Sequence, residues 1–181
     1  MDRRKFVTIG ATSLGVIPLL GFRLIEYPVV PKPTWLLDWI RLYDSQLANY
    51  APLTITDVAS QYAGGYMNEA EMPNPHVTAG FLMNASMLFA CPESVHYLEN
   101  GLLPQIESAI RSLLRMQHTD GTIDLLENNF HSTPDTAFVL ENMVPAYTFL
   151  GQVKGTETAR QLVKTFLKRA GEALIVGGIH T

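Results

Sequence analysis

Apolar side chains recur at intervals of three and four residues through most of the chain beyond residue 34. The clearest run occupies positions i, i+3, i+4, i+7, i+8 and i+11, at Ala159, Leu162, Val163, Phe166, Leu167 and Ala170. This spacing places the apolar residues on one face of an α-helix. No segment shows the sustained alternation of apolar and polar residues that is typical of strands. We therefore expect an all-α fold built from successive helical hairpins.

Turn formers and capping residues divide this pattern into separate helices. Thr34 and Thr156 are candidate N-caps, while Pro92 and Gly151 are candidate helix ends. The expected helical ranges are 34–50, a short helix within 54–72 that runs into a loop, 75–91, 94–117 with a break at 100–101, 134–150 and 156–176.

The C-terminal sequence shows whether an array of such helices could be capped at its end. Stacked helix pairs expose an apolar face at each end until the array closes or is capped. The last five residues, GGIHT, provide no such cap. We therefore expect residues 34–181 to be the N-terminal part of a longer helical domain.

Composition excludes several classes of protein. With 47% hydrophobic and 17% charged residues, the chain can bury a core and fold. Its net charge is −4 and it has no basic cluster beyond the N-terminus, which argues against a nucleic-acid binder. Cys91 is the single cysteine, so the chain can form neither an internal disulfide nor a cysteine-based metal site by itself.

Residues 1–26 are typical of an export signal. Basic residues at positions 3–5 precede an uncharged, mostly apolar run from Phe6 to Phe22. The paired arginines and Phe6 resemble the twin-arginine motif, although Asp2 stands where that motif has Ser or Thr. The implied partner is the twin-arginine export machinery, which carries folded proteins. A general secretory signal and a buried first helix are the alternatives.

The sequence at the end of this signal bears on whether the signal is cleaved or retained. No clear small-x-small cleavage site follows Leu20, so residues 6–22 could remain attached as a membrane anchor. That run, of about 17 residues, is at the lower limit for spanning a bilayer. Residues 27–33 contain three prolines and are interpreted as an extended linker. We expect the rest of the chain to act in the periplasm or outside the cell.

The stretch from Arg115 to Phe138 is unusually polar for a connector between two helices. It contains two histidines, three aspartates, a glutamate and two asparagines. A solvated turn uses residues such as Gly121 and Pro134, but it has no need for an aromatic next to a histidine. We interpret the stretch as the lip of a polar cleft.

His131 is the strongest candidate for chemistry in this stretch. It follows Asn129 and Phe130 and precedes a helix N-terminus, whose free N–H groups favour anions. An imidazole can take and return a proton at physiological pH. A purely structural histidine is the alternative. His180, which follows two glycines, is a second candidate, whereas turn chemistry alone explains Asp120.

A metal centre is the less favoured interpretation. His118, Asp120, Asp124 and His131 lack the helical HxxxH or HExxH spacing that holds ligands ready for an ion. We interpret His118 as a capping or surface residue. The sequence therefore leads us to expect no metal and no other cofactor.

Three features together resemble a known group of proteins. They are the segment QHTDGTIDLLENNFHSTPDTAF, the twin-arginine-like signal and the terminal GGIHT. The group comprises exported bacterial proteins of the (α/α) toroid type that act on acidic polysaccharides, including heparinase II/III-like and alginate lyases and toroidal glucuronidases. The resemblance covers residues 115–181. It implies an incomplete α/α toroid and an acidic polysaccharide or oligosaccharide as the substrate.

The resemblance leaves the reaction open between a lyase and a hydrolase. In a lyase, an Asn or His neutralises the uronate carboxylate and a His or Tyr removes the C5 proton. Asn129 and His131 would fill these roles, with His180 as a third member. No tyrosine stands in a comparable sequence context.

A hydrolase requires a pair of carboxylates instead, one acting as acid and the other as base. Asp124, Glu127 and Asp135 are the candidates for that pair.

The sequence thus predicts an exported enzyme that cleaves glycosidic bonds in uronic-acid-containing glycans. The candidate catalytic residues are His131, Asn129, Asp124, Asp135 and His180. The alternative is a non-catalytic glycan-binding or scaffold protein of the cell envelope, which would use the same cleft for aromatic stacking without proton transfer.

Overall fold

A computed structural model describes residues 32–176 of the chain. The helices are α1 (Thr34–Leu47), the 3₁₀ helix η2 (Ala48–Leu53), α2 (Pro75–Ala90), α3 (Leu102–Met116), α4 (Thr133–Leu150) and α5 (Glu157–Val176). Between α3 and α4 lie two short strands, β1 (Ile123–Leu125) and β2 (Asn129–Ser132). The signal, most of the linker and His180 fall outside the described residues.

Local chemistry explains where α2 and α4 begin. The Asn74 side chain accepts hydrogen bonds from the backbone N–H groups of His76 and Val77, at 2.9 and 3.0 Å, and so caps α2. Ser132 caps α4 in the same way, because its hydroxyl accepts a bond of 3.1 Å from the Asp135 N–H. The predicted side-chain cap at Thr34 is wrong. Pro33 is the N-cap of α1, and no side-chain bond caps that helix.

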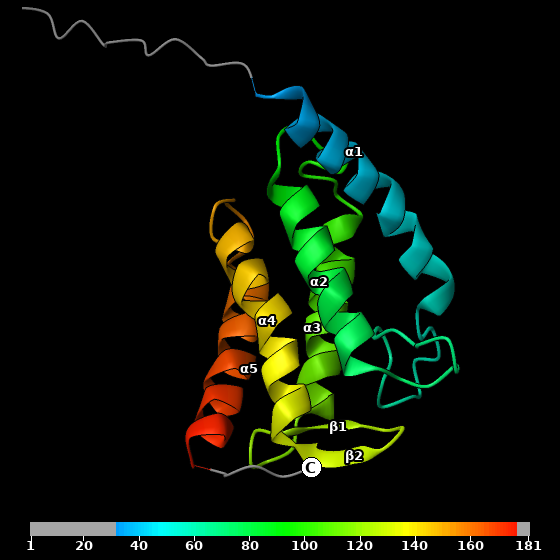
Figure 1. The fold of residues 1–181 in the computed structure, drawn as a ribbon, viewed down its shortest axis with the longest axis vertical. Helices are drawn as coiled ribbons and strands as arrows, with labels where there is room; N and C mark the ends of the chain where they lie inside the picture. Colours follow the sequence, from blue (N-terminus) through cyan, green and yellow to red (C-terminus); the bar gives the residue numbers. More distant parts are fainter. Residues whose placement is uncertain (1–31, 177–181) are drawn as a thin grey trace, which may run out of the picture. The chain divides into compact units, whose positions relative to one another are not determined.

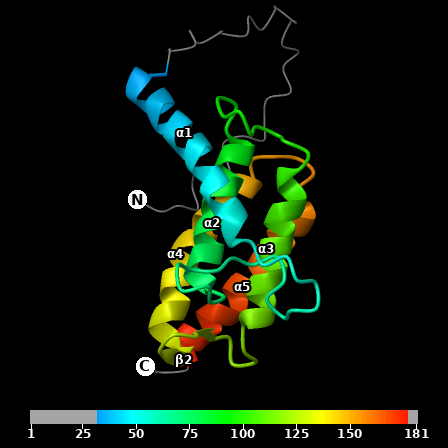
Figure 2. The ribbon, with the colours of Figure 1, turned by 90° about the vertical axis from the view of Figure 1, so that its right-hand side faces the viewer.

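Helices α2, α3, α4 and α5 surround one hydrophobic core (Figure 1). Helix α2 packs against α3 and α4, and α5 packs against the same two helices. Each helix contributes fully buried side chains to the core, among them Leu82, Ile110, Val139 and Phe166. Helix α1 lies outside this ring, packed on α2 and η2 (Figure 2).

This packing corrects the expected architecture. The prediction of successive hairpins that form an incomplete α/α toroid is wrong, because the described helices are not a row of stacked pairs. Since α5 returns to contact α3 as well as α4, the apolar faces of four helices are buried against one another. Helical periodicity shows that each helix has an apolar face, but it does not show which partner covers that face.

The structure also corrects the all-α prediction. Strands β1 and β2 pair antiparallel, with Ile123 opposite Ser132 and Leu125 opposite Asn129. Figure 1 shows this hairpin where α3 ends and α4 begins. The strands have three and four residues, which is too short to display an alternating pattern.

The predicted helix within residues 54–72 is wrong as well. That segment consists of turns with two isolated bridges, Thr54 to Tyr66 and Met67 to Pro73. Gly64 has a φ of +75° and lies so close to α3 that an added Cβ would overlap the side chain of Ser108. Such a backbone conformation suits glycine in a turn and does not occur within an α-helix. Residues 94–101 are also turns, and the helix begins only at Leu102.

None of the helices in residues 32–176 combines the length and the apolar character that a membrane span requires.

Candidate functional site

A tight turn after α3 positions the first histidine of the site. The backbone N–H of His118 donates to the Thr122 carbonyl at 2.9 Å, and the Gly121 N–H donates back to the His118 carbonyl at 3.0 Å. Gly121 has a φ of +89°, and a Cβ at this position would lie 2.2 Å from the Arg169 carbonyl oxygen on α5. Only glycine fits this close approach, so the packing of the turn on α5 fixes where His118 lies.

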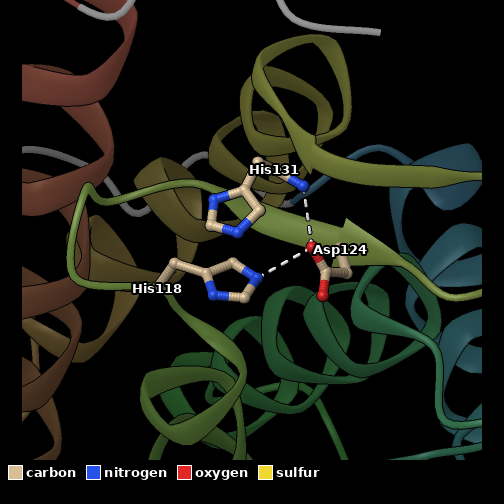
Figure 3. Close-up of side chains that lie close together, drawn as sticks. All are labelled: His118, Asp124 and His131. Carbon is tan, nitrogen blue, oxygen red and sulfur yellow. Dashed lines mark hydrogen bonds and ion pairs between the residues drawn. The ribbon is translucent and has the colours of Figure 1, made fainter.

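The β-hairpin brings the second histidine onto the first. The imidazole rings of His118 and His131 stack, with centroids 3.8 Å apart and planes inclined by 20°. Figure 3 shows the two rings one above the other, on the same side of Asp124. Two residues thirteen positions apart in the sequence therefore share one site.

Asp124 on β1 holds both histidine segments together. Its Oδ1 atom lies 2.8 Å from Nε2 of His118 and also accepts a 2.7 Å hydrogen bond from the backbone N–H of His131 (Figure 3). The backbone of His131 is left-handed, with a φ of +49°. This conformation is uncommon for a residue with a Cβ and is found more often at functional sites. The bond to Asp124 helps to hold it.

Asp120 orients the imidazole of His131. Its Oδ2 atom lies 2.8 Å from Nδ1 of His131, while its Oδ1 atom accepts bonds from the Thr122 hydroxyl and backbone N–H at 2.6 and 2.9 Å. The Thr122 hydroxyl above all, together with the Thr122 N–H and His131, lowers the pKa of Asp120 far below its usual value and outweighs burial, which acts in the opposite direction. Asp120 is thus a stable anion beside an exposed imidazole. We call His118, Asp120, Asp124 and His131 the hairpin cluster.

Three members of the hairpin cluster could hold a metal ion. One ligand atom each from His118, Asp124 and His131 lies within 4.8 Å of the others. Absence of helical spacing led us to expect no such grouping, but a turn and a hairpin bring the residues together instead.

A cleft of about 240 Å³ adjoins the hairpin cluster. Its lining includes Tyr62, Arg115, His118 and Asp124. The Arg115 guanidinium is fixed by bonds from Nε and Nη2 to the carbonyls of Gln61 and Ala63. The cleft therefore presents a fixed positive charge and a phenol beside an imidazole.

A second group of polar residues surrounds a buried carboxylate on the α4 side of the hairpin. We call His76, Asn129, Ser132 and Asp135 the cap cluster. Asp135 accepts bonds from the Asn129 amide at 2.9 Å and from the Ser132 hydroxyl at 2.5 Å. Nε2 of His76 lies 3.1 Å from the other carboxylate oxygen, an ion-pair contact without the alignment of a hydrogen bond.

The cap cluster keeps Asp135 ionised although its side chain is only 7% exposed. Burial by itself raises the pKa of this carboxyl. The bonds from Ser132 and Asn129 and the charge of His76 outweigh burial, so the net result is a lowered pKa. Asp135 is thus an anion in the first turn of α4, where the positive end of the helix dipole favours negative charge.

The structure separates the candidate residues into two groups. It places His131 and Asp124 together in the hairpin cluster. Asn129 and Asp135 lie in the cap cluster, where they bond to each other, and His180 lies outside the described residues.

Sequence reasoning missed four residues of the site. It assigned His118 to the surface and Asp120 to a turn, and it did not select Tyr62 or Arg115. In the sequence, one histidine and one aspartate stand on each side of residues 121–123. A turn at 121–123 brings such flanking residues together, so this placement could have indicated the site.

Comparison with known proteins gives no match. No protein family model, no curated protein and no solved structure matches this chain.

Proposed function

We propose that this protein cleaves glycosidic bonds in uronic-acid-containing glycans, with His131 as the base that removes a proton from the sugar. The observation that carries the proposal is the contact between His131 and Asp120. Nδ1 of His131 faces the carboxylate, and no residue among 32–176 forms a hydrogen bond with Nε2. One ring nitrogen is therefore oriented and the other is available for proton transfer.

The adjoining cleft favours elimination over hydrolysis. In an elimination, the base takes the C5 proton of the uronate, the C5–H electrons form the C4=C5 double bond, and the C4–O bond breaks. The leaving oxygen then needs a proton. Arg115 can neutralise the substrate carboxylate and thereby acidify C5, and the Tyr62 hydroxyl can donate the proton to the leaving oxygen.

The carboxylates expected for hydrolysis have other partners. Asp124 bonds to His118 and to the His131 backbone, and Glu127 bonds to the Asn68 amide. Asp135 is buried in the cap cluster. A general acid and base pair must instead face the scissile bond from two sides. For this reason we propose a lyase.

The substrate class and the location come from the sequence. The motifs in residues 115–181 are the basis for expecting an acidic polysaccharide, and the positive charge of Arg115 in the cleft agrees with such a substrate. The twin-arginine-like residues 1–26 support export to the periplasm or beyond, where residues 6–22 could also attach the protein to the membrane.

The test is an assay of the full-length gene product on uronic-acid polysaccharides. Absorbance of a new double bond and release of reducing sugar are measured together. An increase in both indicates a lyase, whereas reducing sugar alone indicates a hydrolase and contradicts the role of His131. No product from any glycan, together with measurable glycan binding, would favour the non-catalytic binding protein instead.

A further inference from the structure

We propose that the hairpin cluster binds a divalent ion of a late first-row transition metal, such as Zn²⁺, through His118, Asp124 and His131. One ligand atom of each residue already lies within 4.8 Å of the others. An ion bound to three such atoms at its usual distances requires them to be about 3.4 Å apart. The three atoms therefore start near the spacing that an ion requires, and the two stacked rings must tilt apart so that both in-plane lone pairs point at the ion.

The stacked rings place two of the ligands side by side. The imidazoles of His118 and His131 have centroids 3.8 Å apart, and Oδ1 of Asp124 lies 2.8 Å from Nε2 of His118. One ion beside the stack can therefore contact all three ligands.

Asp120 supplies the outer support that metal-binding histidines usually have. It contacts Nδ1 of His131 and is itself fixed by two bonds from Thr122. A carboxylate in this position fixes the orientation of the ring and makes the other nitrogen a better ligand. Half of the His131 side chain is exposed, so an ion can enter from solvent.

The types of ligand select the class of metal. Two imidazoles and one carboxylate suit Zn²⁺, Co²⁺ or Ni²⁺, whereas Ca²⁺ and Mg²⁺ prefer a shell of oxygen atoms. Three protein ligands leave at least one position for water or for an oxygen of a bound molecule.

Binding of the ion has a consequence for the proposed reaction. A metal bound to His131 occupies the lone pair that would accept the sugar proton, so the metal-bound form cannot use this residue as a base. This consequence depends on the proposed function, whereas metal binding itself does not.

The experiment measures metal binding without any glycan. The purified full-length chain is treated with a chelator, dialysed, and titrated with ZnCl₂ by calorimetry and with CoCl₂ by visible absorption. We expect one ion per chain at this site. His118→Ala and Asp124→Asn should each lower the affinity at least about tenfold, and Asp120→Asn should lower it by about 10- to 100-fold.

His96→Asn is the matched control. His96 also pairs with a carboxylate, at 2.6 Å from Glu99, but it lies outside the hairpin cluster. We expect this variant to bind like the parent, and circular dichroism checks that every variant is folded. Parent-like affinity in His118→Ala and Asp124→Asn, or no binding by the parent, would overturn the proposal. Because activity is not measured, a failure of the proposed reaction leaves this result interpretable.

Discussion

The hairpin cluster and the cap cluster are built from similar residues and lie on either side of one short β-hairpin, yet they differ in exposure. The Asp120 side chain is 52% exposed and that of Asp135 is 7% exposed. In the cap cluster, every contact of Asp135 goes to the start of α4 or to neighbouring segments. In the hairpin cluster, about half of the His131 side chain is exposed. Exposure, more than composition, distinguishes the two clusters.

The difference follows from what each carboxylate contacts. A buried anion must satisfy its oxygens within the protein, because leaving one unpaired is costly. Asp135 does this through three side chains and thereby stabilises α4. The Asp120 carboxylate remains in contact with water. Its bond to His131 therefore orients the imidazole ring without burying it. The two clusters should therefore respond differently to substitution.

The largest effect is expected on activity when the imidazole of His131 is removed. His131→Asn suits this test, because asparagine tolerates the left-handed backbone at this position. We expect kcat to fall about 100- to 10,000-fold with glycan binding retained, which is the usual contribution of a general base. Steady-state kinetics on the full-length product measures this. His96→Asn should keep parental kcat, and equal activity of the two variants would contradict the assignment.

The next effect concerns metal ions and the same imidazole. If an ion occupies His131, ZnCl₂ at about ten times its dissociation constant should leave roughly one tenth of the parental activity. Chelation should restore the rate. Rate measurements across a ZnCl₂ titration test this. Unchanged activity at saturating zinc would show that the ion and the base do not share His131.

A third effect concerns stability and belongs to the cap cluster. Asp135→Ala removes the acceptor for Ser132 and Asn129 and leaves the buried Ser132 hydroxyl without it. We expect the free energy of unfolding to fall by about 2–3 kcal/mol. Asp120→Ala is the comparison, and its loss should be smaller because that carboxylate is half exposed, although two bonds from the buried Thr122 are also lost. Urea denaturation followed by circular dichroism measures both values, and equal losses would refute the contrast.

The smallest effect is the pH dependence of stability due to Asp135. Its pKa is lowered in the folded protein, so the unfolded chain binds this proton first as the pH falls. The contribution of Asp135 to stability is therefore complete above the ordinary pKa of an aspartate and is lost as the pH falls through the folded value. Asp135→Asn should flatten the acid limb of a plot of unfolding free energy against pH. An unchanged acid limb in Asp135→Asn would contradict this role of Asp135.

Several helices could be predicted from the sequence because their signals are local. Asn74 and Pro75 mark the start of α2, and Pro134 follows the Ser132 cap of α4. The spacing of apolar residues in α5 is sufficient to define that helix. Propensity, capping and periodicity act within a few residues, so they can be recognised without knowing the neighbours.

The prediction failed where distant segments determine the structure. Residues 54–72 form turns because Gly64 lies against α3, and the hairpin exists because its two very short strands pair with each other. The expected toroid was wrong for the same reason, since the choice of partner for each apolar helix face depends on all the helices together.

The sequence by itself determined that residues 115–138 are rich in groups suited to proton transfer or metal binding, and it identified His131 within them. Only the tertiary structure decided which of these groups meet. Packing of Gly121 on α5 placed His118 below His131, and the hairpin brought Asp124 beside both histidines while burying Asp135 apart. Side-chain chemistry is a property of each residue, whereas distance and burial arise only when the whole chain packs.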